Sequence, residues 1–150
     1  MYQRWLKRDT DKCYFKMPNE VFCLDLDSKE ISIYAYLLRC EDRETYQCHP
    51  SYRTIGKAVK MCENTVRKYV LSLEEKGLVH TEPTTITTKD GRIRNGSLRY
   101  TIRPIQEALK IFYQRQLTRA EEEAEQARLK KRLAQLGKQK PISETEGVSA

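Results

Sequence analysis

Amide, hydroxyl and cationic side chains recur at close spacing in the middle of the sequence. Four of them surround Val66, and they are Asn64, Thr65, Arg67 and Lys68. In a helix, this spacing turns the polar groups away from the side on which Val66 is buried. Asparagine can bond an adenine edge, arginine a guanine edge and lysine a phosphate. These residues are therefore candidates for DNA base readout, and the alternative is an exposed polar helix face.

Two further groups have phosphate-binding chemistry. Ser51, Tyr52 and Arg53 follow a proline and open a predicted helix, whose amide-bearing N-terminus can receive a phosphate. Ser51 is equally suited to capping that helix. Arg92 and Arg94 alternate with an apolar residue in a predicted hairpin, as expected of arginines that lie along a minor groove. The alternative for both arginines is free solvation.

The charge of the chain is concentrated in this same region. The 150 residues carry a formal net charge of +7, and residues 51–103 hold 11 Lys and Arg against 5 Asp and Glu. Such an asymmetry is expected of a surface that meets a polyphosphate, although a solvated basic face would give the same count.

Catalytic, metal and cofactor functions find no support in the sequence. The two histidines, His49 and His80, are far apart, and neither paired acids nor a glycine-rich phosphate loop accompany them. We therefore expect no enzyme activity, no metal and no cofactor. The five cysteines form no C-x-x-C pair and are expected to be reduced and mostly buried. The best alternative is a metal site that joins these residues: Cys40, Cys48, His49 and Cys62.

The hydropathy of the chain indicates a cytoplasmic protein. Its longest apolar run, residues 33–38, is far shorter than the roughly 20 residues that cross a bilayer. The first residues also lack the apolar centre of a signal peptide. We therefore expect no contact with a membrane.

Hydrophobic periodicity predicts three helices before residue 77. The first begins after Asp27, which forms a capping box with Glu30, and ends near Arg39. Its apolar face contains Ile31, Tyr34, Ala35, Leu37 and Leu38. A β-prone stretch at 45–48 precedes a short helix that follows Ser51, with Ile55, Ala58 and Val59 inside. A third helix covers residues 63–76, and Gly77 ends it.

The period then changes from helical to alternating. Residues 78–81 and 98–102 are predicted to pair as strands, and residues 84–97 to form an extended hairpin. Asp90-Gly91 is its predicted turn, and Asn95-Gly96 is a candidate for a second one.

A long helix is predicted from Ile105 to Leu136, because this segment contains neither proline nor glycine. Ile105, Leu109 and Phe112 are placed to pack on the preceding domain. Small residues at 120, 124 and 127 form a narrow stripe, which suits either a weak coiled coil or a solvated helix. The acidic run 121–125 precedes the basic run 128–132, so a homodimer through residues 105–136 would be antiparallel.

The order helix, short strand, helix, three-residue turn, helix and hairpin is the winged-helix arrangement of a helix-turn-helix. The sequence also resembles the winged helix-turn-helix domains of bacterial, phage and plasmid proteins, including those of replication initiators. The resemblance covers roughly residues 14–103. It rests on the segments 15–19 (FKMPN), 34–38 (YAYLL), 48–55 (CHPSYRTI), 64–69 (NTVRKY) and 73–79 (LEEKGLV).

These patterns predict a mainly α fold with a small β-hairpin, a winged helix-turn-helix followed by a long C-terminal helix. The expected division is a flexible N-terminus (1–13), the winged helix-turn-helix domain (14–104), the long helix (105–136) and a disordered tail (137–150). The expected function is sequence-specific binding of double-stranded DNA, in transcription regulation or in the replication or transfer of a mobile element. The alternative is a protein-interaction adaptor built on a winged helix.

The chain departs from the family pattern at two positions of the turn. Lys60 stands where the family usually has glycine, so we expect a residue with a side chain to adopt a left-handed or an altered turn geometry. Cys62 stands where the family usually has serine, so we expect the start of the third helix to be either shifted or weakly capped.

Overall fold

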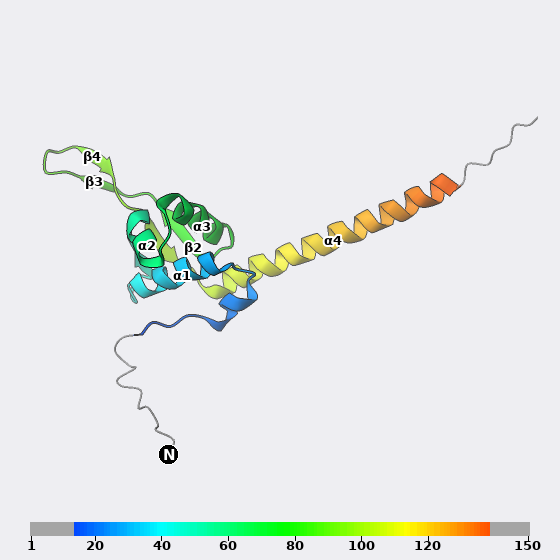
Figure 1. Ribbon diagram of the computed structural model, residues 1–150, viewed down its shortest axis with the longest axis horizontal. Helices are drawn as coiled ribbons and strands as arrows, with labels where there is room; N and C mark the ends of the chain where they lie inside the picture. Colours follow the sequence, from blue (N-terminus) through cyan, green and yellow to red (C-terminus); the bar gives the residue numbers. More distant parts are fainter. Residues whose placement is uncertain (1–13, 139–150) are drawn as a thin grey trace, which may run out of the picture. The chain divides into compact units, whose positions relative to one another are not determined.

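The computed structural model of the protein describes residues 14–138. The N-terminus and all but the first two residues of the predicted tail lie outside this range, so their expected flexibility stays a prediction. The chain divides into two compact units, residues 1–112 and 113–150. The first unit has three helices and small antiparallel sheets (Figure 1), which confirms the predicted winged helix-turn-helix fold.

Helix α1, Ser28–Cys40, follows the short 3-10 helix η1, Asn19–Cys23. The predicted capping box is present, since Asp27 accepts hydrogen bonds from the α1 N-terminus and Glu30 accepts one from the Asp27 N–H. Ile31 and Ala35, expected on the buried face, are only half-buried. The buried apolar face of α1 instead contains Ile33, together with Tyr34, Leu37 and Leu38.

Helices α2, Tyr52–Val59, and α3, Glu63–Glu75, are joined by the predicted three-residue turn. Ile55 is fully buried, but Ala58 is exposed, which corrects its predicted inner position. Because α2 has only eight residues, one helical face suffices to meet the core. The core lies between the three helices and the sheet, and its largest fully buried side chains are Tyr34, Tyr100, Ile33, Leu37, Ile55, Leu73 and Leu78.

The main sheet contains β1, Gln47–Cys48, β5, Arg99–Ile102, and β2, Val79–Glu82, in that order. Both pairings are antiparallel, and the predicted pairing of the strands around residues 80 and 100 is confirmed. Tyr100 lies in the central strand, between Cys48 and Thr81, and is fully buried. Burial strongly raises the pKa of its hydroxyl.

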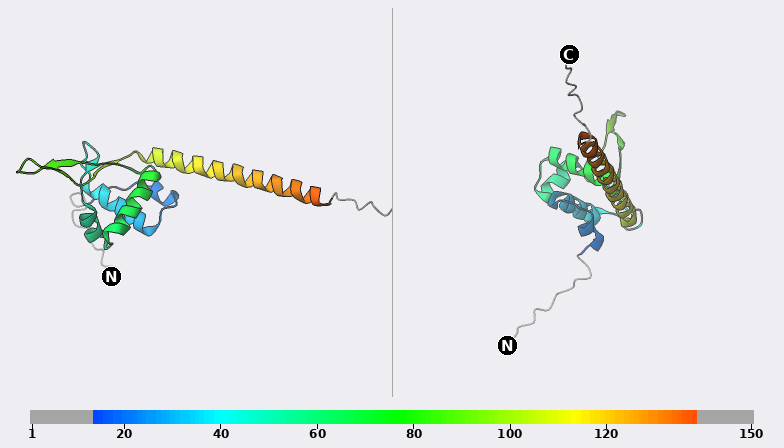
Figure 2. Two further views of the ribbon diagram at one scale, coloured as in Figure 1. Left: turned by 90° about the horizontal axis from the view of Figure 1, so that it is seen from above. Right: turned by 90° about the vertical axis from the view of Figure 1, so that its right-hand side faces the viewer.

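The predicted hairpin forms the wing, with β3, Thr85–Thr87, paired to β4, Ile93–Asn95. Its turn lies at Asp90-Gly91, where the Gly91 N–H donates to the Thr88 carbonyl. The candidate second turn at Asn95-Gly96 is wrong. Asn95 pairs with Thr85, and the Gly96 N–H donates to the Thr84 carbonyl across the hairpin. The wing projects from the helical body in both Figure 1 and Figure 2.

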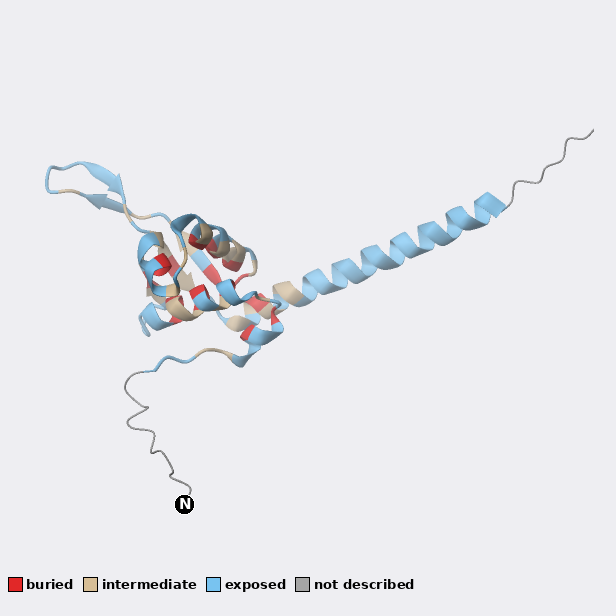
Figure 3. Cartoon of the chain, in the orientation of Figure 1, coloured by how far each residue is buried: buried red, intermediate tan, exposed pale blue. Residues whose placement is uncertain are grey.

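Helix α4 runs from Ile105 to Lys138. Its first two turns belong to the first unit, where Ile105, Leu109 and Phe112 pack on the core as predicted. The end predicted at residue 136 is wrong, since α4 continues through Gly137. A single glycine costs a helix only about 1 kcal/mol relative to alanine. Beyond Phe112, every described residue of α4 is exposed (Figure 3).

Three of the four described cysteines are exposed, which corrects the expectation that the thiols are mostly buried. Cys40 ends α1 and Cys62 precedes α3, so neither is enclosed by a helix face. Cys48 is buried, and burial raises the pKa of its thiol to about 12. Within residues 14–138, no three His, Cys, Asp or Glu side chains are grouped to hold a metal ion.

The same described range offers no helix with the length and hydropathy of a membrane span.

A buried carboxylate ties α1 to α3. Glu30 is 3% exposed, and its Oε2 lies 2.8 Å from the Lys76 ammonium and 2.9 Å from the Asp27 N–H. Its other oxygen accepts a hydrogen bond from the Ser72 hydroxyl. Ser72 is on α3 and Lys76 directly follows it, so this one side chain fixes the end of α3 against the start of α1.

Replacing Glu30 with alanine is expected to lower the free energy of unfolding by about 2–4 kcal/mol, because it removes the cap and leaves a partly buried ammonium without its carboxylate. Glu30→Gln keeps an acceptor and should cost less. Near-UV circular dichroism during urea unfolding follows the buried tyrosines and measures both effects. Glu44→Ala, at an exposed position, is the control, and an equal loss in both alanine variants would contradict this role for Glu30.

Candidate nucleic-acid interface

The turn between α2 and α3 is held by close backbone contacts. Ser51 caps α2, because its hydroxyl accepts a hydrogen bond of 3.1 Å from the Thr54 N–H. At the other end, the Gly56 carbonyl accepts from the Met61 N–H at 2.9 Å. A Cβ on Gly56 would lie 2.4 Å from the Met61 carbonyl oxygen, so only glycine permits this approach. The angle between α2 and α3 therefore depends on position 56.

Both expected departures in the turn are confirmed. Lys60 has φ 59° and ψ 46°, the left-handed conformation that glycine usually supplies. Cys62 precedes α3 without a side-chain hydrogen bond to the helix backbone. Its Sγ lies 3.0 Å from the Thr65 hydroxyl, and this hydrogen bond lowers the pKa of the thiol.

Helix α3 presents an exposed face opposite its buried residues Val66, Val70 and Leu73. Among the predicted readout residues, Asn64, Arg67 and Lys68 lie on this face, whereas Thr65 is half-buried beside Cys62. Sequence reasoning missed Leu71, which belongs to the same face and is 52% exposed. Its position one turn after Arg67 and Lys68 is the signal that would have found it.

Two tyrosines hold cations of this face in place. The guanidinium of Arg67 lies 5.5 Å from the centre of the Tyr52 ring, a cation–π distance. Tyr52 itself packs on the core, and burial raises the pKa of its hydroxyl. Lys68 lies 5.5 Å from the Tyr69 ring, which Lys29 of α1 also approaches. Tyr52, predicted to meet phosphate, therefore also serves to orient Arg67.

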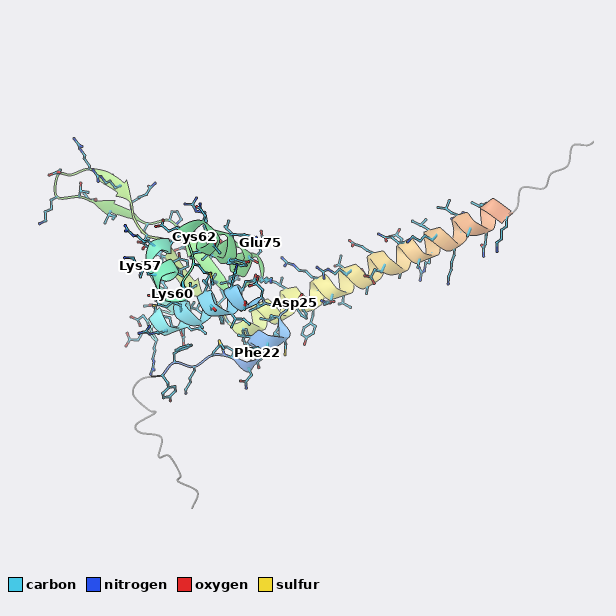
Figure 4. The ribbon with its side chains drawn as sticks, viewed as in Figure 1. Phe22, Asp25, Lys57, Lys60, Cys62 and Glu75 are labelled. Atoms are coloured by element: carbon cyan, nitrogen blue, oxygen red, sulfur yellow. The ribbon has the colours of Figure 1, made fainter. Side chains whose placement is uncertain are left out.

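A shallow basic groove lies beside the turn. Arg53, Lys57, Lys60 and Cys62 contribute to its lining, and Figure 4 shows Lys57, Lys60 and Cys62 along α2 and the start of α3. Of the three basic residues in this lining, only Arg53 was predicted from the sequence to contact phosphate. The spacing of four and then three residues from Arg53 to Lys57 and Lys60 marks one helix face and could have identified the other two.

The wing carries the remaining predicted residues. Arg92 and Arg94 are exposed, and Arg94 pairs directly with Ile86 on the opposite strand. Directly paired residues share a face of a hairpin, so a cation and an apolar side chain lie side by side there. Ile86 is 57% exposed and Ile93, on the other face, 74%.

An ionic cluster fixes the base of the wing to α3. The Glu74 carboxylate accepts hydrogen bonds of 2.9 Å from both the N–H and the hydroxyl of Thr81 in β2. His80 lies between carboxylates, 3.3 Å from Glu74 and 3.7 Å from Glu82. Arg99 donates to Glu82 across the strand pair, which lowers the pKa of the Glu82 carboxyl. Helix α3 and the wing are thus linked through β2.

Ion pairing divides the basic residues of this region into two sets. Lys76, Arg99 and Arg103 are paired with carboxylates inside the domain. The other set is exposed, and no ion pair is found for its members among residues 14–138; it contains Arg53, Lys57, Lys60, Arg67, Lys68, Lys89, Arg92 and Arg94. All of this second set lies on α2, the turn, α3 and the wing.

The model of a family described as a helix-turn-helix domain matches residues 24–79. A possible transcriptional regulator from Methanosarcina mazei Go1 is 17% identical, with 72% of this chain and 82% of that chain covered and a TM-score of 0.47. A mutant of MepR from S. aureus is 20% identical, with coverages of 78% and 83% and a TM-score of 0.38. No curated protein matches.

The matched residues begin just before α1 and end in β2, so they contain the α2–turn–α3 unit whose geometry is described above. This part of the chain has a helix-turn-helix fold.

Proposed function

We propose that the protein binds double-stranded DNA in a sequence-specific manner. The observation that carries this proposal is that the eight basic residues of 51–103 for which no ion pair is found among the described residues all lie on α2, the turn, α3 and the wing. In a winged helix, these are the elements that meet the major groove, the phosphates and the minor groove. The biological setting that we propose is transcription regulation or the replication or transfer of a mobile element.

In this proposal, α3 enters the major groove. Asn64 and Arg67 contact base edges, and Thr65 and Lys68 lie at the margin of the readout. Ser51, Tyr52 and Arg53 approach phosphate at the start of α2, with Lys57 and Lys60 beside them. Stacking on Tyr52 restricts Arg67 before DNA arrives, which reduces the entropy lost on binding.

A protein-interaction adaptor is the second candidate function. The exposure of Leu71, Ile86 and Ile93 favours it, because apolar side chains on these faces suit a protein partner. They also suit DNA, where apolar groups meet thymine methyls and sugars. An absence of DNA binding at about 50 mM salt, where phosphate contacts are strong, would favour the adaptor.

We further propose that α4 forms an antiparallel homodimer. Beyond Phe112, the apolar side chains of α4 that could form the seam of a dimer are exposed. They include the leucines Leu117, Leu129, Leu133 and Leu136. A helix of this length gains stability mainly from packing, which a second copy would supply. Opposite charges at 121–125 and 128–132 then lie side by side.

The first test concerns the salt dependence of DNA affinity. If about five phosphates are neutralised, the slope of log affinity against log salt should be near −4.5 per protomer. Removing the two wing arginines (Arg92→Ala with Arg94→Ala) should flatten this slope by about 1.8 and weaken binding to every duplex.

The matched control for the wing variant is Arg39→Ala with Lys110→Ala, which removes the same charge from exposed positions on α1 and α4. Its slope should stay close to that of the wild type. An unchanged slope in the wing variant would remove the wing from the interface.

The second test concerns readout. Arg67→Ala and Asn64→Ala should each cost about 1–3 kcal/mol on the preferred site and relax the preference at one base position. Selection of duplexes from a random pool, followed by titration, measures both quantities. Equal losses on specific and random DNA would show that these side chains hold phosphate instead.

The third test concerns assembly. Light scattering on the full chain should show a dimer at high micromolar concentration, and Leu129→Lys with Leu133→Lys should shift it to monomer by placing charges in the seam. Glu44→Lys, at an exposed position outside α4, is the control for surface charge. A wild-type monomer at that concentration would contradict the dimer.

A further inference from the structure

A cavity lies on the domain away from α2, α3 and the wing. It is bounded by the entry segment before η1, the end of α1, the loop before β1 and the start of α4, and its volume is about 540 Å³. Binding pockets for small molecules commonly have volumes of roughly 300–1,000 Å³. The apolar part of its wall comes from Met17, Pro18, Leu38, Ile102 and Ile105.

One carboxylate oxygen in the wall has no hydrogen-bond donor among the described residues. The Oε2 atom of Glu41 is enclosed, and none of the described residues donates a hydrogen bond to it. Burial raises the pKa of this carboxyl, while Arg43 acts in the opposite direction. An enclosed acceptor without a donor is costly in a folded protein, and such an atom needs an explanation beyond packing.

Two tyrosines complete the wall. Tyr34 is buried, and its burial together with the nearby charge of Glu41 raises the pKa of its hydroxyl to about 12. Tyr46 is 58% exposed and has φ 57°, a backbone conformation that is unfavourable for an aromatic residue. Such strained residues are concentrated at ligand sites. The Tyr46 backbone is held there, since its carbonyl accepts from the Ile102 N–H at 2.8 Å.

We propose that this cavity binds a small organic amine that has one ammonium group and an apolar body. The ammonium supplies the missing donor to Glu41 Oε2, and the aromatic faces of the wall favour a cation. The apolar body fills the part formed by Leu38, Ile102 and Ile105. Lys16 and the ion-paired Arg103 are also in the wall, so one positive charge is favoured there over the several of a polyamine.

Phenethylamine is a suitable probe, and phenethyl alcohol is its uncharged counterpart of nearly the same shape. Titration of the full-length protein, followed by amide chemical shifts, should show phenethylamine binding with a Kd of about 1 mM or tighter. The shifts should be confined to residues around 16–18, 38–46 and 102–105. The alcohol should bind at least about tenfold more weakly, because it lacks the charge-assisted hydrogen bond.

Glu41→Gln should weaken the amine by about tenfold and leave the alcohol unchanged. Glu44→Gln, an exposed carboxylate in the same loop, is the matched control and should bind as the wild type does. The unperturbed amide spectrum reports whether each variant is folded.

Equal binding of the amine and the alcohol, equal affinity in the wild type and Glu41→Gln, or no shifts at about 10 mM amine would each overturn the proposal. These readouts use no DNA, so their failure is distinct from a failure of the proposed DNA binding.

Discussion

The contacts of the buried Glu30 carboxylate are the interaction on which the position of α3 depends. A helix-turn-helix requires α3 to be held at a fixed angle, and the hydrophobic attraction that buries Val66, Val70 and Leu73 is not directional. Hydrogen bonds and charge pairs are more directional than such contacts. By bonding Ser72 and Lys76 at the end of α3, Glu30 fixes the orientation and register of this helix on α1. The cost of burying the charge is offset by its satisfied oxygens.

The wing depends on α3 in the same way, through a second carboxylate on the same helix. Glu74 faces β2, where it bonds Thr81 and approaches His80, and the strand then pairs with β5 through Arg99 and Glu82. The last turns of α3 therefore hold α1 on one side and the wing on the other. The exposed Asn64 and Arg67 lie nearer the other end of the helix, where no carboxylate of residues 14–138 forms an ion pair with Arg67.

Local signals account for what the sequence predicted correctly. The capping box at Asp27, the C-cap at Gly77 and the hairpin turn at Asp90-Gly91 each involve residues a few positions apart, so their physics is visible in the sequence. Other features depend on residues that only the fold brings together or keeps apart. They include the ion pair of Arg99 with Glu82, the contacts of the Glu30 carboxylate and the exposure of Cys40 and Cys62. The second turn at Asn95-Gly96 was mispredicted for this reason, because cross-strand bonding to the β3 side overrides a local preference.

Contacts made only in the fold also limit what can be inferred about function from the charge of the sequence. Residues 51–103 hold 11 basic side chains, yet Lys76, Arg99 and Arg103 serve the domain itself. A count from sequence therefore overstates the positive charge that is open to a partner. What remains is confined to α2, the turn, α3 and the wing, and a shared location is stronger support for a polyphosphate partner than a total. Glu41 gives the complementary case, in which an enclosed carboxylate oxygen without a donor among the described residues marks a place where the fold leaves room for an external one.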